Sequence, residues 1–135
     1  MAGQKGKMER KKLELSEVPA GDLAYLGDAV LEVLVREHLL SVTHKKGEHL
    51  SDMALEFVTA KAQSDAFSRV ENLLTDDETA VFKRARNNYH TGNVPKSATP
   101  AQYRRATGFE ALFGYLYLTG EKERTSELFK IAYEL

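Results

Sequence analysis

The stretch from Leu23 to Val35 constrains the fold more than any other part of this 135-residue chain. Its apolar residues recur at intervals of three and four, the spacing that gives an α-helix one buried face. No segment alternates polar and apolar residues with a period of two, which is the pattern of a half-buried strand. The sequence therefore predicts an all-α fold, a helical bundle of about five to seven helices. The apolar stripe of the first helix is expected at Leu23, Leu26, Val30, Val33 and Leu34.

Two carboxylates interrupt this apolar stretch. Asp28 and Glu32 lie four residues apart and so share one side of the helix, with Tyr25 one turn before Asp28. Gly27, the residue before Asp28, lowers helix stability unless another group must approach the backbone closely. This combination of two acids and a glycine on an apolar helix indicates that the carboxylates belong to a functional site.

A second apolar stretch, from Ala106 to Gly120, contains a single charged residue, Glu110. An ionised carboxylate in apolar surroundings is unfavourable unless a cation or hydrogen bonds compensate it. A buried ion pair with Arg or Lys is one explanation, and a metal ion shared with Asp28 is the other. Carboxylates without Cys favour hard cations such as Mg²⁺ or Mn²⁺, which activate water for phosphodiester hydrolysis. A di-iron bundle is not expected, because no His follows a Glu at the required three-residue spacing.

The charge is unevenly distributed although the net charge is only −1. All 20 acidic residues lie outside the window from Thr79 to Phe109. Ordinary solvated charges are one interpretation, and cations placed at the end of a helix explain part of the cluster. We favour the other interpretation, a surface that faces a polyanion. The basic residues in the window are Lys83, Arg84, Arg86, Lys96, Arg104 and Arg105.

Length and composition limit the domain organisation. We expect a flexible basic arm at residues 1–15 and a single compact domain at residues 16–135. The absence of Cys excludes a disulfide scaffold and any thiolate site. No apolar run has the length of a signal peptide or a membrane span, so the expectation is a cytoplasmic protein with no membrane contact.

Capping residues, Gly and Pro predict the ends of the helices. Thr75 with Glu78 is a capping-box signature. Thr99 followed by Pro100 predicts a helix start, and Gly120 predicts the end of that helix. The expected helices cover approximately residues 21–40, 51–73, 76–87, 100–118 and 121–133.

The residues around the two isolated acids resemble the ribonuclease III family. Tyr25-Leu-Gly-Asp-Ala-Val30 is similar to the family signature Glu-x-x-Glu-Phe-Leu-Gly-Asp-Ala. Phe109-Glu-Ala-Leu112 is similar to the second family motif, Asp-x-Phe-Glu-Ala-Leu, and the likeness covers about residues 20–133. The resemblance implies a ribonuclease III-like endonuclease domain, an all-α homodimer that cuts double-stranded RNA with Mg²⁺ and leaves short 3′ overhangs.

Two departures narrow the resemblance. Gly21 and Ala24 occupy the Glu positions of the first motif, and Thr107 occupies the Asp position of the second. The chain also ends soon after the nuclease motifs, without a double-stranded-RNA-binding domain. Both features resemble the compact branch called Mini-III, whose members mature large-subunit ribosomal RNA. The resemblance therefore implies the 23S ribosomal RNA precursor as substrate.

The resemblance also implies roles for individual residues. By this resemblance, Asp28 and Glu110 are the metal-binding catalytic acids. The metal is Mg²⁺, and Mn²⁺ can replace it. Another family carboxylate falls near Glu48 by its offset alone, whereas Glu32 either supports the site or pairs with Arg36. Duplex RNA is read mainly through its phosphates and 2′-hydroxyls. The expected phosphate contacts are Lys83, Arg84, Arg86, Asn87, Lys96 and Arg104.

A homodimer also has a physical argument, because two acid clusters related by a twofold axis match two antiparallel strands. The helix around Leu26 to Leu34 would supply the apolar interface. Two other functions stay open from sequence: a non-catalytic ribonuclease III-like RNA-binding protein that has lost acids, and a helical interaction module without nucleic acid.

Overall fold

The computed structural model describes residues 14–42, 49–88 and 96–135. Within these residues the regular elements are all helical, which confirms the predicted all-α fold and the expected number of helices. Two short 3₁₀ helices, η2 (Leu15–Glu17) and η3 (Glu71–Leu73), accompany the α-helices. The α-helices are α1 (Ala20–Val42), α2 (Leu50–Val58), α3 (Ala60–Val70), α4 (Asp76–Arg86), α5 (Pro100–Leu118) and α6 (Lys122–Ala132).

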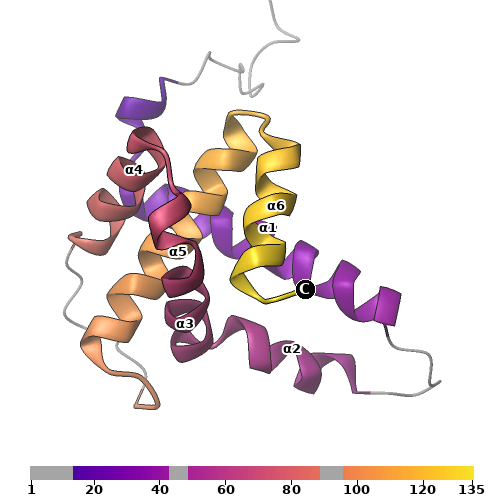
Figure 1. Ribbon diagram of the computed structural model, residues 1–135. Coiled ribbons are helices and arrows are strands. Elements are labelled where there is room, and N and C mark those ends of the chain that lie inside the picture. Colours follow the sequence, from indigo (N-terminus) through magenta and orange to yellow (C-terminus); the bar gives the residue numbers. More distant parts are fainter. Residues whose placement is uncertain (1–13, 43–48, 89–95) are drawn as a thin grey trace, which may run out of the picture.

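Helix α5 is the central element of the bundle. It crosses the long helix α1 and also packs against α3, α4 and α6 (Figure 1). Because neighbours cover it on several sides, its apolar residues are not confined to one stripe, as expected for a buried helix. Its fully buried side chains include Phe109, Leu112, Phe113 and Leu116. The two predicted acids therefore lie on the pair of helices with the closest mutual packing.

The second predicted helix is wrong in its length. Instead of one helix over residues 51–73, the structure has α2 and α3, separated at Thr59, whose ψ of 155° is extended. The Thr59 side chain caps α3 by accepting a hydrogen bond from the backbone N–H of Ala62 at 3.2 Å. This local hydrogen bond offers the backbone an alternative to continuing the helix.

The buried face of α1 also differs from the predicted stripe. Of that stripe, Leu23 is buried as predicted, Leu26, Val30 and Leu34 are half-buried, and Val33 is 56% exposed. The buried face of the helix includes the small residues Ala20, Ala24 and Gly27. At Gly27 the α5 backbone comes so close to α1 that no larger side chain would fit. Small residues carry little hydrophobic signal, so the larger neighbouring side chains dominate the sequence pattern. The buried residues of α1 are Ala20, Leu23, Ala24, Gly27, Leu31, Val35 and Leu39.

The predicted caps at Thr75, Thr99 and Gly120 are confirmed, whereas Ser51, a further candidate N-cap, lies inside α2. In α4, Thr75 accepts from the backbone of Glu78 at 3.2 Å, and the Glu78 carboxylate accepts from the backbone of Thr75 at 2.9 Å. Thr99 and Gln102 form the same reciprocal pair at the start of α5. Gly120 has a φ of 73°, the left-handed conformation that ends a helix and favours glycine.

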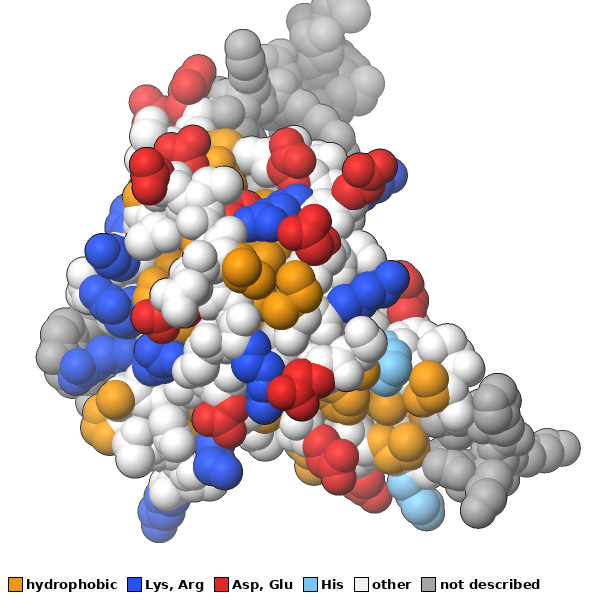
Figure 2. All heavy atoms as spheres, in the orientation of Figure 1, with side chains coloured by type: hydrophobic (Ala, Val, Ile, Leu, Met, Phe, Trp, Pro, Cys, Tyr) orange, Lys and Arg blue, Asp and Glu red, His pale blue; other side chains and the backbone are white. Residues whose placement is uncertain are grey.

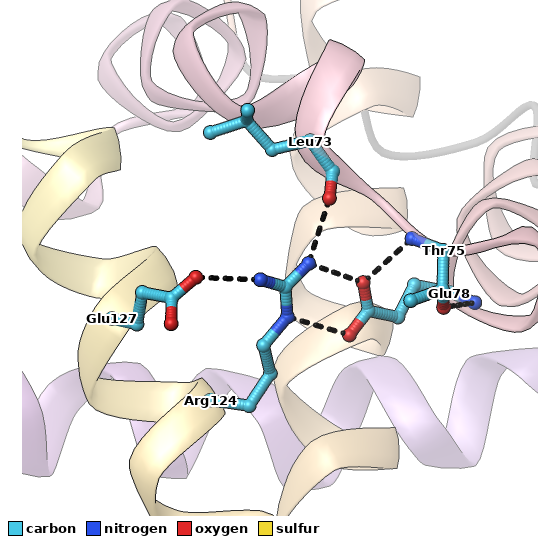
Figure 3. A network of polar contacts seen from close by, with 5 residues as sticks. All are labelled: Leu73, Thr75, Glu78, Arg124 and Glu127. Carbon is cyan, nitrogen blue, oxygen red and sulfur yellow. Dashed lines mark hydrogen bonds and ion pairs between the residues drawn. The ribbon is translucent and has the colours of Figure 1, made fainter.

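An ion pair with little solvent exposure joins α6 to the start of α4 (Figure 3). Two guanidinium nitrogens of Arg124 donate to the two carboxylate oxygens of Glu78, at 3.0 and 2.8 Å. The same guanidinium donates to the carbonyl of Leu73 at 2.7 Å and to Glu127 at 2.7 Å. The hydrogen bond from Arg124 holds the pKa of Glu78 below its usual value. This network fixes where α4 begins, and therefore where its basic last turn lies.

Several sequence predictions fall partly outside the described residues. The predicted N-terminal arm, residues 1–15, is described only at Glu14 and Leu15, and the boundary of the compact domain stays a prediction. Of the described helices, none has the length and apolar character required to cross a membrane.

Candidate active site

The crossing of α1 over α5 is built from two glycines. A Cβ atom at Gly27 would overlap the backbone carbonyl oxygen of Glu110 and lie 2.9 Å from the backbone nitrogen of Gly114. A Cβ at Gly114 would overlap the carbonyl of Leu23. The two backbones are therefore in direct contact, which explains why glycine is present inside two long helices despite its cost.

This contact brings the two predicted acids together. Asp28 follows Gly27 in α1, and Glu110 is the residue in α5 whose carbonyl faces Gly27. The Asp28 side chain is exposed and that of Glu110 is half-buried, and a hydrogen bond joins the two carboxyl groups. The acids therefore lie at the edge of the helix crossing, open to solvent on the Asp28 side.

The surroundings of Glu110 favour its protonated form. Burial, together with the hydrogen bond and the negative charge of Asp28, raises the pKa of Glu110 to about 9. Two adjacent carboxylates that cannot both ionise without a compensating charge are typical of functional acid pairs. A divalent cation between them would supply that charge. Among the described residues, no Arg or Lys forms an ion pair with Glu110, so the buried ion pair considered from sequence is not found there.

This shift predicts a pH dependence of stability in the presence of EDTA. Because the folded-state pKa of Glu110, about 9, exceeds its usual value of 4.5, the folded chain holds a proton between these pH values that the unfolded chain has lost. The stability from this group is present below pH 4.5 and is lost as the pH rises through about 9. Glu110→Gln should therefore be more stable than wild type at pH 8, by about 1 kcal/mol or more.

Urea denaturation of both proteins at pH 5 and pH 8 measures this difference. Every other titrating group is common to both, so the change in their stability difference between the two pH values reports on Glu110. An equal difference at both pH values would contradict the raised pKa.

Among the described residues, no third carboxylate joins this pair. Glu48 lies outside the described residues, so its predicted role stays a prediction. Glu32 forms an ion pair with Arg36 at 3.5 Å, one of the two roles considered for it. In the described ranges, no three His, Asp or Glu side chains are grouped closely enough to hold a metal ion by themselves.

Tyr133, which the sequence did not indicate as a site residue, lies near Glu110. The Tyr133 hydroxyl donates to the carbonyl of Phe57 at 2.7 Å. Burial and the charge of Glu110 raise the pKa of the Tyr133 phenol, which places this ring in the electrostatic surroundings of the acid. Its position two residues from the end of the chain gives no sequence signal for such a role.

The predicted basic residues lie at the end of α4 and the start of α5. Figure 2 shows Lys and Arg side chains gathered over this edge of the molecule, whereas acidic side chains collect over the first turns of α4 and α6. Lys83, Asn87 and Lys96 are exposed, and Arg86 and Arg104 are half-buried. Much of the loop between the two helices, residues 89–95, lies outside the described residues.

Two of the basic residues in the acid-free window, Arg84 and Arg105, form hydrogen bonds with distant segments of the chain. Arg84 donates to the carbonyls of Ser16 and Val18, at 3.3 and 2.9 Å, and so holds the segment before α1 against α4. Arg105 donates to the hydroxyl of Ser64 at 3.0 Å and to that of Ser68 at 2.5 Å. Arg84 therefore has a structural role, and its predicted contact with RNA stays a prediction.

Comparisons with known proteins agree with this geometry. Residues 21–121 match the family described as Ribonuclease III domain. The chain is 46% identical to Mini-ribonuclease 3 of Symbiobacterium thermophilum, over 85% of this chain and 88% of that protein. It is 44% identical to Mini-ribonuclease 3 of Enterococcus faecalis, over 78% and 81%. A crystal structure of a Fusobacterium nucleatum protein superimposes with a TM-score of 0.79 at 28% identity, covering 89% of this chain and 91% of that one. The matched domain includes both acids, and the relatives have a similar length. This chain therefore belongs to the ribonuclease III family and is a ribonuclease of the Mini-ribonuclease 3 kind.

Proposed function

We propose that this ribonuclease is a Mg²⁺-dependent endonuclease specific for double-stranded RNA and that its natural substrate is the 23S ribosomal RNA precursor. The observation that carries the proposal is the direct pairing of Asp28 with Glu110 at the helix crossing. The substrate is inherited from the resemblance to the compact Mini-III branch, and the relatives' names support that branch.

The donor set fits a hard divalent cation. Asp28 and Glu110 offer carboxylate oxygens only, and the exposed side of Asp28 leaves room for the waters that Mg²⁺ retains. When bound, the ion lowers the pKa of a water and stabilises the leaving oxygen of the phosphodiester. Glu110 must lose its proton to act as a ligand, so metal affinity should increase with pH up to about 9.

The chain's own residues bind and orient the duplex. The exposed Lys83 and Lys96 and the half-buried Arg86 and Arg104 present positive charge on the edge formed by α4 and α5. Contacts of this kind read the shape and the phosphates of an RNA duplex rather than its base sequence. Glu110 and Arg104 lie on the same helix, α5, which fixes the position of this cation relative to this acid.

An exposed apolar face of α1 supports a homodimer. Tyr25, Val33 and Leu40 are 84%, 56% and 67% exposed and recur at seven- or eight-residue spacing on the helix. Side chains of this size on one face favour burial against a second copy. The sequence predicted an interface around Leu26 to Leu34, but Val30 and Leu34 pack against the core. We therefore propose that the interface lies on the neighbouring face of α1.

Cleavage of a long RNA duplex in low salt tests the proposal. Cutting with Mg²⁺ and none with EDTA is expected, and the same sequence as a single strand should resist cleavage. Duplex binding without cutting, under Mg²⁺ and Mn²⁺ and with ribosomal substrates, would favour the non-catalytic RNA-binding protein. Absence of both binding and cutting would reject an RNA-directed function.

The basic edge predicts how salt affects binding. Lys83→Ala and Lys96→Ala should each weaken duplex binding and lower the slope of log affinity against log salt by about one, because each loses one phosphate contact. Lys130→Ala, an exposed lysine on α6, is the matched control and should leave the slope unchanged. Titrations with the catalytically inactive Glu110→Gln background avoid cleavage during the measurement. Equal slopes in all variants would place the RNA on another face.

A further inference from the structure

Two arginines and two phenylalanines from three helices form a single stack. The rings of Phe67 (α3) and Phe82 (α4) are parallel, with centroids 3.7 Å apart and planes 6° apart. The guanidinium of Arg105 (α5) lies over Phe67 at 5.1 Å, and that of Arg86 (α4) lies over Phe82 at 5.5 Å. No guanidinium fits between rings 3.7 Å apart, so the order is Arg105, Phe67, Phe82, Arg86.

The two cations make this ring arrangement favourable. A face-to-face ring pair brings two electron-rich faces together, which is less favourable than an offset or edge-on pair. A cation over each outer face attracts the ring electrons and offsets that repulsion. The stack thereby holds the Arg86 guanidinium in a defined plane, although Arg86 belongs to the last turn of α4.

One end of the stack is anchored in the protein and the other is open to solvent. Arg105 is held by the hydroxyls of Ser64 and Ser68 and lies 3.7 Å from the carboxylate of Glu71. Arg86 donates only its Nε–H to a described side chain, that of Asn87 at 3.1 Å. Its two terminal nitrogens are thus available as a planar fork, the geometry that suits a phosphate.

The stack rests on the helix that carries the catalytic acid. A Cβ atom at Gly108 would lie 2.5 Å from two ring atoms of Phe82 and 3.0 Å from its carbonyl oxygen. The Phe82 ring therefore lies directly against the α5 backbone, two residues before Glu110. At Glu110 itself, Gly27 places the α1 backbone against α5, next to Asp28. Arg86 and the acid pair are thus connected through rigid contacts that leave no room for a side chain.

We propose that this four-residue stack is a positioning unit that sets which phosphodiester bond of a bound RNA duplex is cut. Phe67, Phe82 and Arg105 fix the Arg86–Asn87 pair relative to Asp28 and Glu110, and Arg86 holds a phosphate away from the scissile one. The spacing between the held phosphate and the acids then selects the bond. This inference rests on the proposed function, because it concerns the placement of the same duplex in the same site.

Mapping the cut in a defined duplex tests the inference. An end-labelled RNA duplex, cleaved with Mg²⁺ and resolved at single-nucleotide level, should be cut by wild type mainly at one bond in each strand. Arg86→Lys keeps the charge but loses the planar stacking surface. It should retain the salt slope of wild type, distribute its cuts over neighbouring bonds, and lower kcat/KM by about ten- to a hundredfold. Phe82→Leu, which removes the ring, should distribute the cuts in the same way.

Phe129→Leu is the matched control. Phe129 is a buried ring on α6 whose only aromatic partner in the described residues is Tyr133, so this variant loses packing without altering the stack. It should cut at the wild-type bond. If circular dichroism shows that Phe82→Leu does not fold, the cleavage pattern of Arg86→Lys alone tests the inference, since the Arg86 side chain is not part of the core.

The outcomes separate this inference from the proposed function. A wild type that cuts, with Arg86→Lys and Phe82→Leu cutting at the same single bond, overturns the positioning role alone. A wild type that binds the duplex without cutting it overturns the proposed function and this inference with it.

Discussion

Asp28→Asn and Glu110→Gln are each expected to reduce duplex cleavage by about a thousandfold or more, because each removes one of the two carboxylates that we propose as ligands for the cation. Duplex binding should persist, since the basic edge at α4 and α5 is unchanged. The fold should persist as well, because neutralising one acid relieves the repulsion between the pair. Single-turnover cleavage at saturating enzyme, with a gel-shift titration of the same RNA, separates the two effects.

Glu37→Gln provides the matched control for these variants. Glu37 is an exposed acid on α1, and it has no part in the site. It should cleave at the wild-type rate, which would show that loss of one negative charge on this helix is not itself the cause. Wild-type turnover in Asp28→Asn would instead remove this residue from the mechanism.

Gly27→Ala is expected to destabilise the fold by at least about 3 kcal/mol, an effect at the upper end for one methyl group. The added Cβ overlaps the carbonyl oxygen of Glu110, and backbone atoms cannot move aside by rotating a side chain. The helices α1 and α5 would have to separate, so the acids would no longer meet. Urea denaturation monitored by circular dichroism measures the loss of stability.

Gly21→Ala is the control on the same helix. The nearest atom to a Cβ at Gly21 is the side-chain nitrogen of Asn88 at 3.9 Å, an ordinary van der Waals distance. Because alanine favours a helix over glycine, this variant should be neutral or stabilised by up to about 1 kcal/mol. Equal stability of the two variants would show that the crossing tolerates side-chain volume.

The two predictions concern one physical feature. Gly27 and Gly114 allow two backbones to touch, and the touching backbones bring Asp28 and Glu110 within hydrogen-bonding reach. The resulting pair is unfavourable for the metal-free protein, which is a common property of active sites. We therefore expect Glu110→Gln to gain stability at pH 8 while losing activity.

The sequence predicted most helix ends correctly because caps act through near neighbours in the chain. Thr75 with Glu78 and Thr99 with Gln102 satisfy backbone groups within one turn, so no distant residue is needed to recognise them. The break at Thr59 was missed, because the apolar periodicity continues through it and a threonine within a helical pattern is a weak signal. The family resemblance depended on local motifs as well, and the comparisons confirm it.

Contacts between distant residues could not be predicted in this way. Arg84 and Arg105 lie in the same acid-free window as Lys83, yet both donate to oxygens of distant chain segments. Nothing in the window distinguishes them, because their partners lie 66 and 41 residues away in the chain. The stack of Phe67 on Phe82 has the same origin, since it joins helices whose sequences show only buried aromatic positions.

By itself, the sequence determined the all-α fold, most helix ends and the family, because these depend on periodicity, capping and short motifs within single segments. Tertiary structure alone decided which face of α1 is buried, which arginines bond to distant chain segments, and that the pKa of Glu110 is raised. These depend on the distance between chain segments and on the solvent that packing excludes. The burial of Glu110 beside Asp28 exists only because α1 and α5 cross at glycine.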